Sequence, residues 1–343
     1  MVIFVAMKIL FIGGTGNISA ACARQALSRD WEVRMLNRGN RSRPGLEKAV
    51  SIRADISKPE AVREALKGQV FDVVANFIAY KPEEVKRDIQ LFSGIIRQYM
   101  FISSASAYQK PPSHPVITES TPLKNPYWEY SRDKIACEDE LVKAYREKDF
   151  PVTIIRPSLT YDTVIPVAIG SWEDYTIIDR MKKGRKVIIH GDGTSLWTIT
   201  HSDDFASGFT GLCGHQQAVG HSFHITSDEV LTWNQIYQAV ADAAGVKLNA
   251  VHIPSDFICR VAGSLGQEWM WGNLLGDKAA SVIFDNTKIK RFVPGFNATI
   301  RFSEGIKRTL RWFETDPSRM KVIDDNNMLM DEIINQYEQK SKP

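Results

Sequence analysis

The sequence lacks the patterns that mark metal-binding, disulfide-linked and membrane-spanning proteins. Its seven histidines include no H-E-x-x-H motif, so no metal site is predicted. No two cysteines have the C-x-x-C spacing of a zinc or redox site, and free thiols are typical of a reducing compartment. We therefore expect a cytoplasmic protein. The apolar first residues have no basic stretch and no cleavage site and are too few to cross a bilayer, so no membrane association is predicted. The four cysteines are Cys22, Cys137, Cys213 and Cys259.

An excess of charge of one sign is missing as well. The 43 Lys and Arg residues nearly balance the 40 Asp and Glu residues, and the formal net charge is +3 without any block of like charges. This composition does not favour a nucleic acid as partner. An RNA-binding protein stays open as an alternative, and it would use scattered basic residues against phosphates. Those residues are Arg41, Arg43, Lys182, Lys183, Arg185 and Lys186.

The first half of the chain alternates apolar runs with helical stretches. The runs predict strands at Lys8–Ile12, Glu32–Leu36, Ala49–Arg53, Phe71–Asn76, Tyr99–Ser103 and Val152–Arg156. The stretches between them predict helices at Asn17–Ser28, Pro59–Leu66, Glu83–Gln98 and Tyr130–Lys148. Because β-α-β crossovers are right-handed, this order winds into a sheet with helices on both faces. We predict the α/β class, a Rossmann-type doubly wound parallel sheet with a smaller C-terminal substrate-binding portion.

The pattern loosens after Arg156. We expect residues 1–165 to form a dinucleotide-binding core that is completed by 198–230. The smaller portion would comprise 166–197 and 231–320, and a C-terminal helix would lie within 321–343. Helices are predicted at Asp203–Leu212, Thr232–Ala244 and Met328–Gln339, whereas the residues from 251 to 302 are poorly periodic.

A glycine-rich turn, Gly13-Gly14-Thr15-Gly16-Asn17-Ile18-Ser19, directly follows the first predicted strand and opens the first helix. Unpaired backbone N–H groups and the helix dipole make such a helix N-terminus suitable for a pyrophosphate. Glycine permits the tight turn and the close approach of phosphates. The residues expected to contact the cofactor here are Gly13, Thr15, Gly16, Asn17 and Ile18.

The second predicted strand ends in Asn37-Arg38-Gly39-Asn40-Arg41. An acidic residue at this place favours the ribose hydroxyls of NAD, whereas an arginine favours the 2′-phosphate of NADP. Asn37 is neutral and Arg38 and Arg41 are positive, so the cofactor is predicted as NAD(P), with NADP weakly preferred and NAD not excluded. Alternatively, both arginines face solvent. Asp55, followed by Ile56, comes directly after the third strand and either accepts a hydrogen bond from the adenine or caps the next helix.

Tyr130 and Lys134 are four residues apart on a predicted helix, which places them on one face. A phenol with its ordinary pKa of about 10 is a poor base near neutrality. A neighbouring ammonium favours the phenolate and would lower that pKa, so that the phenol can exchange a proton with a substrate hydroxyl or carbonyl. Ser103 and Ser104 end the fifth predicted strand, at the sheet edge where such folds hold ligands. The natural partner reaction is hydride transfer to or from nicotinamide.

Together these elements resemble the extended short-chain dehydrogenase/reductase family, which includes NAD-dependent sugar-nucleotide epimerases and dehydratases. Further matches are Arg156-Pro157, Gly191-Asp192-Gly193 and His201-Ser202-Asp203-Asp204. The resemblance implies that Tyr130 is the acid–base, that Lys134 contacts the nicotinamide ribose and that Ser104 orients the substrate. It also places Asn76 and Lys81 along the cofactor. The Gly13–Ser19 loop, Asn37-Arg38-Gly39 and the stretch 285–312 are similar to the chloroplast stem-loop-binding branch, some members of which bind RNA.

Three departures from the family pattern are informative. Ser19 stands where the loop usually has its third glycine. Ala105 and Ser106 stand where 4,6-dehydratases have an Asp-Glu pair, which argues against that dehydration. Trp197 stands where many sugar-nucleotide enzymes have a diphosphate-binding arginine, and an indole cannot make that forked, charged contact. We expect Ser106 and Trp197 to line the substrate site with Ser104 and Tyr130, although Trp197 either stacks on a ligand or only packs in the core.

The leading expectation is an NAD(P)-dependent epimerase or oxidoreductase that acts on a secondary alcohol or ketone of a sugar-like or nucleotide-linked substrate. An epimerase comes first by a small margin over a reductase or dehydrogenase. The alternatives are an RNA-binding protein on a Rossmann fold and a non-catalytic NADP-binding redox sensor. A homodimer is expected from the resemblance alone.

Overall fold

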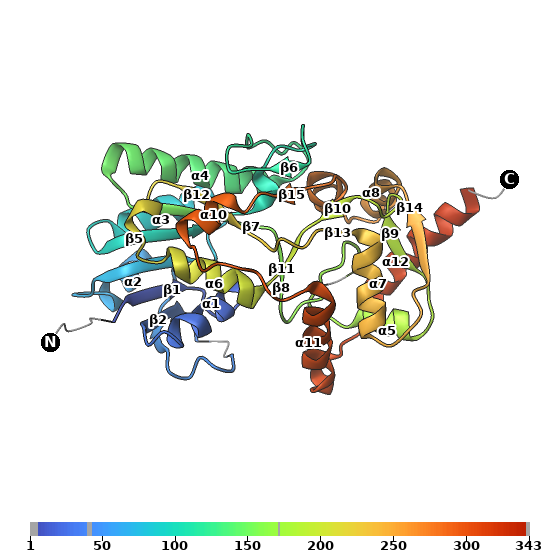
Figure 1. Ribbon diagram of the computed structural model, residues 1–343, viewed down its shortest axis with the longest axis horizontal. Helices are drawn as coiled ribbons and strands as arrows, with labels where there is room; N and C mark the ends of the chain where they lie inside the picture. Colours follow the sequence, from blue (N-terminus) through green and yellow to red (C-terminus); the bar gives the residue numbers. More distant parts are fainter. Residues whose placement is uncertain (1–5, 40–42, 171, 341–343) are drawn as a thin grey trace.

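The computed structural model describes residues 6–39, 43–170 and 172–340, and a seven-stranded sheet occupies the left half of the view in Figure 1. The sheet has the order β12-β7-β5-β4-β1-β2-β3, and every neighbouring pair is parallel. This confirms the Rossmann-type fold predicted from the sequence. The strands are β1 (Lys8–Ile12), β2 (Glu32–Asn37), β3 (Val50–Arg53), β4 (Phe71–Asn76), β5 (Ile96–Ile102), β7 (Val152–Pro157) and β12 (Ser222–Ile225).

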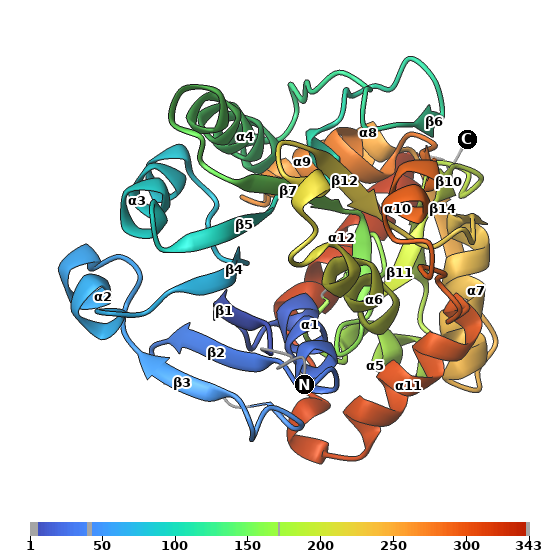
Figure 2. The same ribbon diagram turned by 60° about the vertical axis from the view of Figure 1, so that its left-hand side comes forward.

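Helices cover both faces of the sheet because its strands are apolar on both sides (Figure 2). Along β1, Ile9 and Phe11 pack into one core, whereas Leu10 and Ile12 pack into the other. The first core includes residues of α1 (Asn17–Leu27), α6 (Ser202–Leu212) and α10 (Thr287–Phe292). The second includes residues of α2 (Pro59–Ala65), α3 (Pro82–Phe92) and α4 (Glu129–Lys148). Because successive side chains of a strand point to opposite faces, each strand contributes apolar side chains to both cores.

The predicted helix Glu83–Gln98 is wrong at its C-terminal end. Helix α3 ends at Phe92, and Gly94 turns the chain with a φ of +82°. The strand β5 then begins at Ile96, three residues before its predicted start. The apolar Ile95 and Ile96 continue the helical pattern in the sequence, but they belong to the turn and the strand. A glycine in the left-handed region ends helices in this way.

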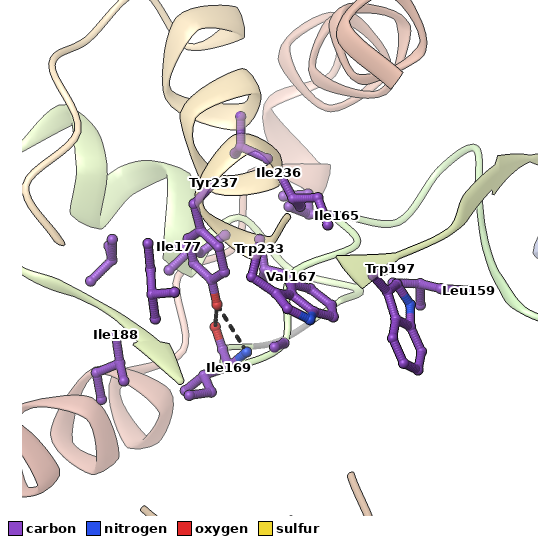
Figure 3. Close-up of a cluster of buried hydrophobic side chains, with 14 of the residues drawn as sticks. Leu159, Ile165, Val167, Ile169, Ile177, Ile188, Trp197, Trp233, Ile236 and Tyr237 are labelled. Atoms are coloured by element: carbon purple, nitrogen blue, oxygen red, sulfur yellow. Dashed lines mark hydrogen bonds between the residues drawn. The ribbon is translucent and has the colours of Figure 1, made fainter. Parts of the chain in front are cut away.

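The rest of the chain forms a smaller part beside the sheet, with a core of its own. Figure 3 shows part of this core, in which the Tyr237 hydroxyl accepts a hydrogen bond from the backbone N–H of Ile169 at 3.1 Å. Its strands are β6 (Val116–Ile117), β8 (Leu159–Tyr161), β9 (Val187–His190), β10 (Leu196–Trp197), β11 (Ile199–His201), β13 (Leu231–Thr232), β14 (Ala250–Ile253) and β15 (Ile283–Phe284). Its helices include α5 (Thr176–Lys182), α7 (Trp233–Ala243), α8 (Ser255–Ser264), α9 (Trp269–Asn273) and α11 (Phe302–Glu314).

The poorly periodic stretch from 251 to 302 is more regular than the sequence indicates. It contains β14, α8, α9, a π-helical turn at Leu274–Lys278, β15 and α10. Apart from the ten-residue α8, these elements are too short to show a hydrophobic period of their own. The described chain also contains four short 3-10 and π segments: η1 (Ala105–Ala107), η2 (Gln216–Ala218), η3 (Leu274–Lys278) and η4 (Pro317–Arg319). How the chain divides into domains stays a prediction.

The last helix, α12 (Asp324–Lys340), packs on the smaller part of the molecule. Its Met330, Ile333 and Ile334 are buried in that core. Asp331 also forms an ion pair with Arg180, whose side chain is almost wholly buried. In the described part of the chain, no helix is both long enough and apolar enough to cross a membrane.

Candidate active site

The glycine turn between β1 and α1 leaves no space for side chains. Gly13 has a φ of +95°, and a Cβ atom there would lie 2.6 Å from Cγ2 of Ile78. A Cβ atom on Gly14 would lie 2.8 Å from the sulfur of Met35. Ser19, at the position of the usual third glycine, accepts a hydrogen bond from the Gly16 N–H at 2.8 Å. The serine therefore fits this turn and ties its ends together.

A cavity of about 450 Å³ opens beside this turn, at the carboxyl ends of β1, β2 and β3. Six residues predicted to bind the cofactor line it: Gly13, Thr15, Asn37, Arg38, Asp55 and Ile56. Three more were not predicted: Leu36, Ala54 and Ile78. Leu36 and Ala54 could have been found as the neighbours of strand ends, which share one edge of a parallel sheet. Ile78 follows β4 and has no local signal.

Two polar side chains of this cavity, Asn37 and Asp55, accept hydrogen bonds from backbone N–H groups of their own turns. The Asn37 side chain accepts a hydrogen bond from the Gly39 N–H at 2.8 Å. Asp55 accepts from the backbone N–H of Ser57 at 3.0 Å, and this bond is the main cause of the lowered pKa of Asp55. The capping interpretation of Asp55 is wrong, because α2 begins at Pro59 with Lys58 before it and has no side-chain cap, and the Asp55 carboxylate is bonded within the preceding turn. Arg38 is exposed at the cavity wall, and Arg41 lies outside the described residues.

The other predicted cofactor residues do not line this cavity. The Asn17 side chain donates to the carbonyl of Thr160 at 3.2 Å and accepts from the N–H of Thr163 at 3.2 Å, which joins α1 to the chain after β7. The buried Asn76 donates to Asp88 and accepts from the N–H of Ile78. The four remaining residues lie elsewhere: Gly16 precedes α1, Lys81 is exposed before α3, Ile18 lines a second cavity, and Lys134 is buried on α4.

This second cavity, of about 290 Å³, brings together all four residues predicted to contact the substrate: Ser104, Ser106, Tyr130 and Trp197. Aromatic rings form much of its wall. Its full lining is Ile18, Ser104, Ala105, Ser106, Lys110, Trp128, Tyr130, Pro157, Ser158, Leu159, Thr160, Trp172, Trp197, Asp277, Lys278 and Phe284. Residues from both ends of the chain thus meet in one cavity.

Tyr130 and Lys134 lie one turn apart at the start of α4. The Lys134 side chain is buried, and its ammonium donates to the carbonyls of Ala79 at 2.7 Å and Ile102 at 2.8 Å. The ammonium lies 5.8 Å from the centroid of the Tyr130 ring and 4.6 Å from that of Tyr80. Burial lowers the pKa of Lys134 to about 8. The lysine is therefore held in place by the end of β5 and by aromatic faces.

The expected lowering of the pKa of Tyr130 by Lys134 is wrong. Burial raises the pKa of Tyr130 above its ordinary value, and a hydrogen bond with Ser104 opposes this rise only in part. The physical reason is that burial disfavours the charged phenolate, and the Lys134 ammonium gives its hydrogen bonds to two backbone carbonyls. Tyr130 is consequently a neutral phenol at neutral pH.

The serines beside Tyr130 form a chain of hydroxyl groups. The Ser104 and Ser106 hydroxyls are 2.8 Å apart, and the Ser131 hydroxyl donates to Ser106 at 2.7 Å. The Ser104 hydroxyl also accepts from the backbone N–H of Ser106 at 3.2 Å. These contacts fix Ser104 at the end of β5, on the wall of the second cavity.

Sequence reasoning missed three charged residues of the second cavity. Lys110 donates to the carbonyl of Asp277 at 3.0 Å, and its ammonium lies 5.3 Å from the centroid of the Trp197 ring. Lys278 donates to the Asp277 carboxylate at 2.9 Å and to Asn273 at 2.8 Å. Lys110 and Lys278 are far apart in the sequence, so no spacing could have indicated that they meet.

Of the basic residues weighed for RNA binding, the five that the structure describes form contacts within the protein. Lys182 forms an ion pair with Glu314 at 2.7 Å, and Lys183 forms one with Asp179 at 2.8 Å. Arg185 and Lys186 pair with carboxylates of α12, namely Asp331 and Glu338. Arg43 donates to the carbonyl of Thr15 at 3.1 Å. Within the described ranges, no cluster of three or more His, Cys, Asp or Glu residues is placed to hold a metal ion.

Comparison with known proteins adds a family and relatives. The profile of the NAD dependent epimerase/dehydratase family matches residues 9–226. The chain is 26% identical over 251 residues to the chloroplast stem-loop binding protein of 41 kDa b of Arabidopsis thaliana. This alignment covers 69% of this chain and 63% of that protein. It is 30% identical over 170 residues to a UDP-glucose 4-epimerase of Lactobacillus helveticus. This alignment covers 44% of this chain and 51% of that protein. The chain thus spans less than two thirds of the length of either relative.

Among solved structures, the UDP-Glc/GlcNAc 4-epimerase of Campylobacter jejuni matches with a TM-score of 0.70 at 20% identity. The match covers 91% of this chain and 100% of that one. A likeness at this identity shows a shared fold.

Proposed function

The chain belongs to the NAD dependent epimerase/dehydratase family, and on that basis we propose that it is an NAD(P)-dependent epimerase or oxidoreductase. Its substrate is a sugar-like or nucleotide-linked compound with a secondary alcohol or ketone. The observation that carries this proposal is the second cavity, where Tyr130 and Ser104 share a wall one helical turn from the buried Lys134. A surface tyrosine and lysine at the same spacing would have no such enclosure.

In this proposal the first cavity and the adjoining N-terminus of α1 hold the dinucleotide. The glycine turn allows phosphates to approach the backbone, and the N-terminus of α1 provides N–H donors and a favourable dipole. Arg38 on the cavity wall would face a 2′-phosphate, which favours NADP without excluding NAD. Lys134 would contact the ribose of the nicotinamide. When bound, the nicotinamide supplies the hydride acceptor and donor.

Tyr130 moves the proton in this proposal. As a neutral phenol it is ready to protonate a carbonyl oxygen, and as a phenolate it accepts the proton of a hydroxyl. Ser104 donates a hydrogen bond to the same substrate oxygen, because its hydroxyl is held at the cavity wall by Ser106. Lys134, whose ammonium lies 5.8 Å from the centroid of the Tyr130 ring, serves the cofactor in this proposal.

The two alternatives have less support. An RNA-binding face needs basic groups that are available for phosphates, whereas the four around α5 are paired with carboxylates. A non-catalytic NADP-binding redox sensor needs no acid–base pair, whereas here Tyr130 lines a cavity one helical turn from the buried Lys134. A homodimer through α3 and α4 is part of the proposal and follows from the family resemblance.

Mass spectrometry of the nucleotide released by denaturing freshly purified protein tests this function. Retained NAD would favour an epimerase, in which the cofactor is regenerated within each turnover. A protein that releases no nucleotide but binds added NADP more tightly than NAD would favour a reductase or dehydrogenase. Binding of neither cofactor would overturn the proposal.

A further inference from the structure

The second cavity carries one positive charge in excess. Its charged lining residues are Lys110, Lys278 and Asp277, that is, two cations and one anion. The Asp277 carboxylate is directed at Lys278, with which it forms an ion pair at 2.9 Å. The Lys110 ammonium donates to the backbone carbonyl of Asp277 at 3.0 Å and forms no ion pair with a carboxylate of the described residues. The unbalanced charge is therefore that of Lys110.

Lys110 is a costly residue to bury without a counter-ion. Its side chain is 4% exposed, and no carboxylate in the described part of the chain lies within 4.0 Å of its ammonium. Burial lowers the pKa of Lys110 to about 8, which leaves it mostly protonated at neutral pH. Buried charges are normally paired. The missing partner is an anion.

Trp197 provides a second, independent sign of a ligand at this wall. The residue is 2% exposed, lines the same cavity, and its indole N–H has no acceptor within the described residues. Most buried donors in folded proteins are satisfied. The Lys110 ammonium lies 5.3 Å from the centroid of the Trp197 ring, so the lysine without a carboxylate partner and the tryptophan with the unsatisfied indole N–H are neighbours.

The other lysine of the cavity, Lys278, is held in place by its neighbours. The carbonyl of Lys278 lies 3.1 Å from Nε2 of His190 and accepts from the indole N–H of Trp233 at 3.1 Å. The ammonium of Lys278 also lies 5.3 Å from the centroid of Trp172 and 5.9 Å from that of Trp128. Such aromatic faces suit the apolar C–H face of a sugar ring.

We propose that the substrate is a sugar acid, whose single carboxylate binds Lys110 and Trp197 while its ring lies against the tryptophans of the cavity. This inference rests on the proposed function and names its substrate class. One carboxylate balances the one excess charge, whereas a phosphate monoester carries about −1.5 to −2 and a diphosphate at least as much. No arginine is among the residues that line the cavity, so the forked donor that best holds a diphosphate is missing there.

Titration of the intrinsic tryptophan fluorescence tests the proposal, because three tryptophans line the cavity. The probes are glucuronate against glucose, and galacturonate against galactose, in the presence of saturating cofactor. Glucose 6-phosphate and UDP-glucose are added as ligands with more charge. We expect at least one sugar acid to bind about tenfold or more tightly than its neutral parent, and more tightly than either phosphorylated ligand.

Lys110→Met should abolish the preference for the acid, and Lys124→Met should keep it, because Lys124 is exposed on the same segment. The proposal is overturned if neither acid exceeds its parent sugar, if a phosphorylated ligand binds more tightly than both acids, or if Lys110→Met keeps the preference. Cofactor binding is measured on the same samples. Intact cofactor binding without acid preference refutes the sugar acid alone, whereas loss of cofactor binding in the unaltered protein refutes the proposed function.

Discussion

The ammonium of Lys134 lies 5.8 Å from the ring centroid of Tyr130, yet its hydrogen bonds go to the carbonyls of Ala79 and Ile102. The spacing of Tyr130 and Lys134 in the sequence suggests that the two side chains act on each other, but in the structure each is held by different partners. The lysine is fixed by the backbone at the ends of β4 and β5, and the phenol is left to Ser104 and the cavity. Tyr130 thereby remains a neutral phenol at neutral pH.

Arg38→Ala should weaken NADP more than NAD. The guanidinium lies on the wall of the first cavity, and losing a charged contact to a 2′-phosphate costs about 1.5–3 kcal/mol, or roughly tenfold to a hundredfold in Kd. Isothermal titration with both cofactors measures this. Arg97→Ala is the matched control, because Arg97 is an exposed arginine near the start of β5, whereas the first cavity lies at the carboxyl ends of the strands. Equal losses for both cofactors would remove the case for a 2′-phosphate contact.

Lys110→Met should stabilise the protein near pH 7. A lysine whose pKa falls from 10.5 to about 8 on folding corresponds to a burial cost of about 3 kcal/mol, part of which is offset by the lost hydrogen bond to Asp277. We expect the free energy of unfolding to rise by about 1–3 kcal/mol in urea denaturation. A less stable variant would show that Lys110 serves the fold.

The same substitution has a defined pH dependence. The folded-state pKa of Lys110 is lowered, so between about 8 and 10.5 the unfolded chain holds more of this proton than the folded one. The cost of burying Lys110 is therefore full below pH 8 and shrinks as the pH rises toward 10.5. The stability advantage of Lys110→Met should shrink in the same range. Lys134 titrates similarly but is present in both proteins, so it cancels in the difference.

Binding of a sugar acid should weaken as the pH rises above about 8. Lys110 must be protonated to hold the carboxylate, and Asp277 and Lys278 are the other charged groups that act on it. A bound anion favours the ammonium, so the midpoint should lie above the pKa of the free protein. Fluorescence titrations from pH 6 to pH 10 measure this, with the neutral parent sugar as reference. A constant ratio of the two affinities over this range would contradict the role of Lys110.

The sequence predicts the parts of the molecule that have a local pattern. The buried runs of β1, β2, β4 and β7 stand out because parallel strands are apolar on both faces. The first cavity could be predicted because its residues follow strand ends that meet at one edge. The boundary of α3 could not, since Ile95 and Ile96 fit a helical period until Gly94 turns the chain.

The charge of the second cavity could not be predicted, because it depends on contacts between distant segments. Lys110 looks like a surface lysine in its own stretch, and only the packing of Leu274–Lys278 against that stretch buries it. Trp197 shows the same limit. Its two interpretations, packing in the core and facing a ligand, are not exclusive, because the residue is buried in the core and lines the cavity.

Tyr130→Phe, compared with Tyr127→Phe, tests the central claim most directly. Tyr127 is an exposed tyrosine three residues before Tyr130, so its substitution controls for the loss of a hydroxyl near the start of α4. Turnover is followed as substrate-dependent reduction of the bound nicotinamide at 340 nm. We predict that Tyr130→Phe lowers the rate by about a hundredfold to ten-thousandfold while the Kd of the cofactor stays unchanged. A Tyr130→Phe protein as active as the Tyr127→Phe protein would contradict the account.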